Sequence, residues 1–219
     1  MKKITLSIAA AALLFTTACN DAPKGDNVNA TDAKEAQAGA GAELKADVTA
    51  TKIDWIGSKP LGDNHKGTIS LKEGNVKVDG TNITGGKFVF DLNSLTPMDQ
   101  DSTGNAKLKG HLLAPDFLDV AKFPDGTFEI TGVTAGVDTS KVEFKEGTHT
   151  VTGNLTLKGV SKSITFPAKV SVTADRVEAH AVFNIDRTQW GISYNSDASI
   201  KDKFINKEIN LTLHLVATK

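Results

Sequence analysis

The feature that most constrains the fold is a period of two in the apolar residues from about residue 50 to the C-terminus. Ile53 and Trp55 alternate with Lys52 and Asp54, and the same rhythm returns in many later short runs that glycines separate. Such alternation is typical of strands with one buried face. Closure of an antiparallel sheet into a barrel removes its exposed edges. We therefore predict an all-β fold built as a closed antiparallel barrel.

Two stretches depart from this rhythm. Between residues 105 and 119, leucines recur at helical spacing until Pro115, which ends or kinks a helix. A second short helical turn is expected at residues 199–204. Val142 and Phe144 alternate with their neighbours, so they predict a short additional strand.

Composition and charge exclude several function classes. Hydrophobic residues make up 39% and charged residues 23% of the 219, which is typical of a globular domain rather than a disordered chain. The formal net charge is −1, so no excess of cations exists to neutralise a nucleic-acid backbone. The single cysteine excludes an internal disulfide.

The N-terminal part predicts secretion and anchoring. Two lysines precede an apolar run that is too short to span a bilayer, so residues 1–18 are expected to be a signal peptide. Thr16-Thr17-Ala18-Cys19 resembles the lipobox of bacterial lipoproteins, although leucine is more usual at the position of Thr16. Acyl chains on Cys19 would anchor the chain to a membrane, and the alternative is a cysteine that lies by chance near an ordinary cleavage site. Residues 19–48 are polar and alanine-rich, which predicts a flexible tether, and residues 49–219 are expected to form the barrel domain.

The expected location follows from this leader. A lipoprotein signal of bacterial type predicts a membrane-anchored protein of the bacterial cell envelope, facing the periplasm or the cell surface. The sequence leaves open which membrane and leaflet would hold the anchor, and whether the chain forms a homodimer.

Four motifs in the predicted barrel, in the same order along the chain, resemble the YceI family. One departure is Leu118, where that family more usually has an aromatic residue. The motifs are Trp55-Ile56-Gly57; Asp116-Phe117-Leu118-Asp119 leading to Lys122-Phe123-Pro124 and Thr127-Phe128; Gly153 to Val160; and Asp186-Arg187-Thr188-Gln189-Trp190-Gly191-Ile192.

The resemblance implies an extended, lipocalin-like antiparallel barrel of about eight strands with one or two short helices. It also implies that the barrel encloses a long-chain apolar lipid, either a polyisoprenoid or an isoprenoid quinone. An eight-stranded barrel can instead be filled by its own side chains, and periodicity does not separate the two cases. Phe117 and Trp190 are expected at the barrel mouth. The expected lining and mouth residues are Trp55, Phe88, Phe90, Phe117, Phe128, Leu155, Phe166, Ala179, Ala181, Phe183, Trp190 and Leu213.

Arg187 is the most prominent polar residue of these motifs. Its expected role is to fix the turn at residues 186–192 through ion pairs or hydrogen bonds, and contact with a lipid head group is the alternative. The five histidines are dispersed, so no metal site is expected, and nothing indicates a cofactor other than a bound lipid.

Three function classes remain after these observations. The favoured hypothesis is a non-enzymatic carrier or reservoir for an apolar lipid. The alternative is a lipid-free barrel scaffold that binds a protein partner through its outer face and loops. A lipid hydrolase or isomerase ranks last, because the predicted inward positions are almost wholly apolar.

Overall fold

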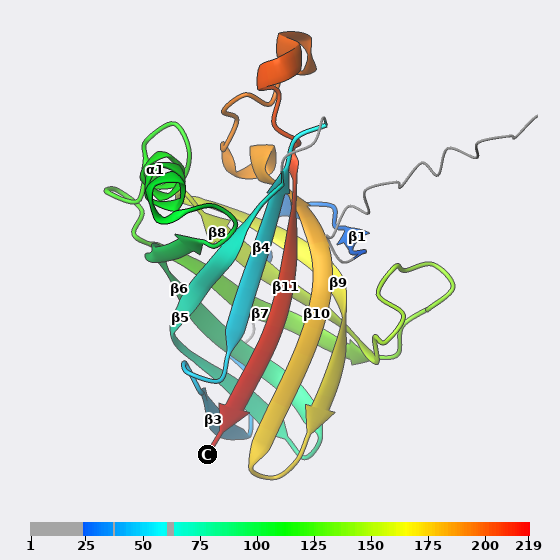
Figure 1. The fold of residues 1–219 in the computed structure, drawn as a ribbon. Helices are drawn as coiled ribbons and strands as arrows, with labels where there is room; N and C mark the ends of the chain where they lie inside the picture. The colour runs from blue at the N-terminus through cyan, green and yellow to red at the C-terminus, as the bar shows by residue number, and fades with distance from the viewer. Residues whose placement is uncertain (1–23, 37, 61–63) are drawn as a thin grey trace, which may run out of the picture.

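The structure, a computed structural model, describes residues 24–36, 38–60 and 64–219. Eight antiparallel strands, β4 to β11, pair in sequence order, and β11 pairs with β4 to close the ring (Figure 1). The prediction of a closed antiparallel barrel is therefore confirmed. The strands are β4 (Lys52–Ser58), β5 (Asn64–Asp79), β6 (Asn82–Pro97), β7 (Asp125–Ala135), β8 (His149–Leu157), β9 (Val160–Val172), β10 (Arg176–Asp186) and β11 (Glu208–Thr218).

The segment before β4 is not a free tether over its described residues. It contains three strands, β1 (Asp26–Asn27), β2 (Thr31–Asp32) and β3 (Ala42–Ala46). Strand β3 pairs with both β5 and β11, and its Leu44 is fully buried. The predicted boundary at residue 48 is therefore wrong, since an apolar side chain inside the sheet fixes the segment in place. The predicted signal peptide and Cys19 lie outside the described residues.

The strands β9 and β10 separate over half of their length. They pair only where residues 169–172 face residues 177–180. The pairing ends at Lys169, and Pro167, two residues earlier in β9, has no N–H to donate. Beyond that point β1 pairs with β10 and β2 pairs with β9. Between them, Val28 and Ala30 pack against the barrel core. We call residues 26–32 the N-terminal strap, because they bridge this seam.

One end of the barrel carries the helical elements of the described residues (Figure 1). Helix α1 (Ser102–Leu113) begins after Asp101, whose carboxylate accepts a hydrogen bond from the N–H of Gly104 at 2.7 Å. Two 3₁₀ turns, η1 (Arg187–Trp190) and η2 (Ala198–Lys203), connect β10 to β11 at the same end. Within the described residues, no helix has the length and apolar content needed to cross a bilayer.

Residues 136–148 form a loop instead of the predicted short strand. The carboxylate of Asp26 accepts hydrogen bonds from the N–H groups of Glu143 and Phe144, at 2.8 and 3.2 Å. Phe144 is buried and packs edge-on against His180 of β10. The two apolar residues that predicted a strand thus belong to a loop that packs against the barrel, and of the two only Phe144 is buried.

Candidate functional site

The barrel is hollow and contains a cavity of about 600 Å³. Such a volume lies within the range of small-molecule sites in proteins. Most of the lining side chains are aliphatic or aromatic, and among the described residues that line it there is no aspartate or glutamate. Of the lining and mouth residues that the sequence predicts, the cavity is bordered by Trp55, Phe88, Phe90, Phe117, Phe128, Leu155, Phe166, Ala179, Ala181, Phe183 and Leu213.

Inward-facing apolar side chains remain partly accessible in this barrel. Phe90, Phe128, Leu211 and Leu213 line the cavity, yet each is only half-buried. A core filled by its own side chains packs at crystal-like density and leaves few such voids. The exposed inner apolar surface therefore favours occupation by a ligand over a solid core.

Three alanines occur along the cavity wall where larger side chains would reduce its volume. They are Ala168 on β9 and Ala179 and Ala181 on β10. Nearby, the rings of Phe166 and Phe183 stack with centroids 4.2 Å apart, which joins β9 to β10 on the inner side of the seam. The small residues leave room for an elongated apolar molecule beside this pair of rings.

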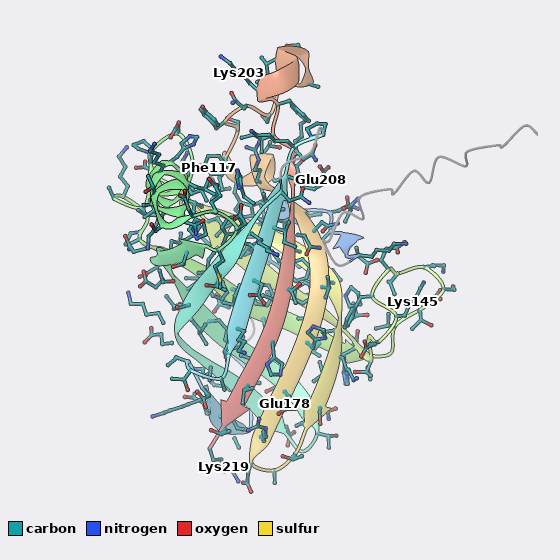
Figure 2. The ribbon with its side chains drawn as sticks, in the orientation of Figure 1. Phe117, Lys145, Glu178, Lys203, Glu208 and Lys219 are labelled. Carbon is teal, nitrogen blue, oxygen red and sulfur yellow. The ribbon has the colours of Figure 1, made fainter. Side chains whose placement is uncertain are left out.

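The mouth end of the cavity is bordered by a group of rings that we call the mouth cluster, made of His111, Phe117 and Tyr194. His111 meets Tyr194 edge-on at 4.6 Å between centroids and Phe117 at 5.7 Å. Figure 2 shows Phe117 beside α1, at the end of the barrel opposite Glu178 and Lys219. The sequence predicts Phe117 here, but it does not single out His111 among the histidines, or Tyr194, because these rings meet only after α1 and the β10–β11 connection fold over the barrel.

Arg187 lies beside Phe117 of this cluster and is only 1% exposed. Its guanidinium donates three hydrogen bonds to backbone carbonyls, and the ring of Phe117 lies 5.5 Å from its central carbon. The expected role in fixing the turn is therefore present in the geometry. The acceptors are the carbonyl oxygens of Asn206 at 3.1 Å, Ile192 at 2.6 Å and Ile205 at 3.0 Å.

Trp190 differs from its predicted place at the mouth. It is fully buried, does not border the cavity, and donates from Nε1 to the carbonyl of Leu155 at 2.9 Å. The turn η1 ends at Gly191, whose left-handed φ of 71° suits glycine. The indole thus joins this turn to β8 and is a structural residue rather than a lining one.

Two further polar groups belong to the cavity wall. The Nε1 of Trp55 is buried and has no acceptor among the described residues, although the indole itself borders the cavity. His65 borders the mouth end and contacts the Asp99 carboxylate through Nδ1 at 2.8 Å. Burial raises the pKa of Asp99, but hydrogen bonds from His65 and from the N–H of Lys66 outweigh it and hold that pKa below its ordinary value.

Comparisons with known proteins agree with this architecture. A YceI-like domain model matches residues 31–217. The protein YceI of Salmonella newport (strain SL254) is 32% identical over 176 residues, which are 80% of this chain and 76% of that protein.

Two solved structures are similar in fold. BcnA from Burkholderia cenocepacia superposes with a TM-score of 0.59 at 21% identity, over 79% of this chain and 99% of that one. A polyisoprenoid binding domain from Saccharophagus degradans, described as implicated in plant cell wall breakdown, superposes with a TM-score of 0.57 at 16% identity. That match covers 80% of this chain and 97% of that domain.

Proposed function

Because the chain belongs to the YceI-like family, we propose that it binds a long-chain apolar lipid of the polyisoprenoid or isoprenoid-quinone kind inside its barrel. The observation that carries this proposal is the cavity of about 600 Å³ with its largely apolar wall. The fold similarity to a polyisoprenoid binding domain supports the choice of ligand class.

The physical basis of binding is burial of hydrocarbon. Each Å² of apolar surface removed from water contributes roughly 25 cal/mol, so a long chain gains affinity without many polar contacts. The partly accessible rings of Phe90 and Phe128 and the leucines of β11 would be covered by the same event. Length and shape of the chain would then decide specificity.

The role that we propose is carriage or storage rather than catalysis. The titratable side chains that border the cavity include His65, His111, Arg187 and Tyr194. In the contacts of the described residues, none of them is hydrogen-bonded to a serine, threonine, cysteine or lysine side chain. With Cys19 lipidated, the protein would act in the bacterial cell envelope and exchange its lipid close to a membrane.

Native mass spectrometry with organic extraction tests this proposal. The chain from residue 20 onward, which keeps every described strand, is purified from a bacterial host without detergent. We expect one long-chain lipid per protein, lost in Ala181→Phe because the added ring occupies the cavity.

The matched control is His180→Phe, on the same strand, since His180 does not border the cavity and already packs against Phe144. It should keep the lipid. A protein that is empty and takes up neither polyprenyl lipids nor quinones on addition would contradict the proposal and favour a scaffold that binds a protein partner.

A further inference from the structure

The buried charge at the mouth of the cavity carries information about the head group of the ligand. Arg187 is cationic, only 1% exposed, and borders the cavity. Among the described residues no carboxylate forms an ion pair with it. A buried charge without a counter-ion is costly unless hydrogen bonds or an opposite charge compensate it.

The hydrogen bonds of Arg187 compensate it only in part. A guanidinium has five N–H donors, and three of them are used by the carbonyls of Ile192, Ile205 and Asn206. Two donors therefore have no acceptor among the described residues. The pKa of Arg187 is lowered by burial, while the more distant charges of Asp186 and Glu208 act in the opposite sense. Asp186 is itself engaged, because it accepts hydrogen bonds from the N–H and hydroxyl of Thr188.

The surroundings of Arg187 reinforce its charge. Lys59 also borders the cavity, while the cavity lining among the described residues contains no acidic side chain. In an apolar, water-poor space the field of a cation is weakly screened, so its attraction for an anion is larger than at the surface. The mouth cluster adds further polar atoms at this end of the cavity. The hydroxyl of Tyr194 and the Nδ1 of His111 have no hydrogen-bond partner among the described residues, whereas Nε2 of His111 contacts Asp116 at 3.2 Å.

We infer that the ligand is an acidic amphiphile, whose carboxylate or phosphate head group lies at the mouth and accepts hydrogen bonds from the two unused N–H groups of Arg187. The apolar chain then extends from Phe117 into the barrel. This inference rests on the proposed function, because it assumes that an apolar chain occupies the cavity. It selects an anionic head group over the neutral ring of a quinone.

Matched pairs of ligands test the inference. Farnesyl monophosphate is compared with farnesol, and oleic acid with oleyl alcohol, by titrating the lipid-free chain from residue 20 onward. Binding is followed by tryptophan fluorescence, because Trp55, one of the two tryptophans, borders the cavity. Hydrogen bonds to charged groups predict that each anion binds roughly tenfold to hundredfold more tightly than its alcohol. A preference for the phosphate alone, or for the carboxylate alone, would identify which acid the mouth accepts.

Variants of the two arginines show where the preference arises. Arg187→Gln should lose most of the preference for farnesyl monophosphate over farnesol, so the ratio of the two affinities is the readout rather than either affinity alone. Arg176→Gln is the matched control, since this other arginine lies exposed on β10 beside Glu178 and does not border the cavity. If Arg187→Gln fails to fold, the comparison of anion and alcohol in the wild type still decides the question.

The outcomes separate this inference from the proposed function. Equal affinity for anion and alcohol would overturn the acidic head group and leave lipid binding intact. Failure to bind any of the four molecules or longer chains of either kind would count against the proposed function itself. A preference for the anion that persists in a folded Arg187→Gln would also overturn the inference, because the selectivity would then come from another cation.

Discussion

Replacement of Leu44 by alanine tests whether the segment before the barrel is part of the fold. Leu44 is fully buried in β3, where it faces Val76 of β5 in the cluster near the end of the barrel opposite the mouth. Truncation of a fully buried leucine to alanine costs about 2–5 kcal/mol, depending on how far the surroundings collapse. Because β5 and β11 hold β3 from both sides, we expect little collapse and a loss of at least ~3 kcal/mol.

Thermal and urea unfolding, followed by circular dichroism on the chain from residue 20 onward, measure this loss. For a domain of this size the loss corresponds to a fall in Tm of roughly 5–15 °C. Val48→Ala is the control, since Val48 lies in the same segment and is 43% exposed. A change below about 0.5 kcal/mol for Leu44→Ala, as for an exposed site, would show that β3 does not stabilise the barrel and would restore the flexible tether.

Three further predictions concern pH, the Trp190 indole and the N-terminal strap. The pKa of Asp99 is depressed in the folded protein, so the ionised carboxylate stabilises the fold above the ordinary pKa of 3.8, and this stability is lost as pH falls through the folded pKa. Asp99→Asn should therefore weaken the dependence of the unfolding free energy on acidic pH. An unchanged pH profile would contradict the role of the contact between Asp99 and His65. Trp190→Phe removes the donor to the buried carbonyl of Leu155 and should cost about 1–3 kcal/mol in urea unfolding while lipid content in native mass spectrometry stays unchanged, since the indole does not border the cavity. Gly25→Val places a Cβ 2.9 Å from the backbone of β10, so it should displace the strap and increase hydrogen exchange at the seam, and unaltered exchange would argue against the strap.

The barrel is predictable from the sequence because its signal is local. Alternation of buried and exposed residues, as in Ile53 and Trp55 against Lys52 and Asp54, depends only on the pleat of a strand. The same periodicity identifies Phe88, Phe128 and the other lining residues. It does not show whether the interior is open, since that depends on the summed volume of side chains from all eight strands.

The N-terminal strands escape sequence reasoning for a different reason. Strands β1 and β2 have two residues each, and β3 has a single fully buried residue, Leu44, in a polar context. Their pairing partners lie far along the chain, as in the contact of Asp26 with Phe183. No local period marks such segments, although the isolated leucine is the one signal that could have been noticed.

The sequence predicts which residues in the turns at the mouth are aromatic, but not where their side chains point. The YceI-like motifs predict Phe117 and Trp190 equally as mouth residues. In the structure Phe117 borders the cavity, whereas the indole of Trp190, just before the left-handed Gly191, reaches β8 instead. The two roles of Arg187 are likewise not exclusive. Three of its donors fix the turn, and two are left for the head group that we propose.

The most direct test of lipid binding inside the barrel is a crystal structure of the protein loaded with an apolar chain that carries bromine at its far end. Anomalous scattering locates the bromine independently of the rest of the density. We predict one peak inside the barrel, near Phe88 and Ile130, with the chain running from Phe117 at the mouth. A bromine peak on the outer wall, or a cavity filled by rearranged side chains with the lipid outside, would contradict lipid binding inside the barrel.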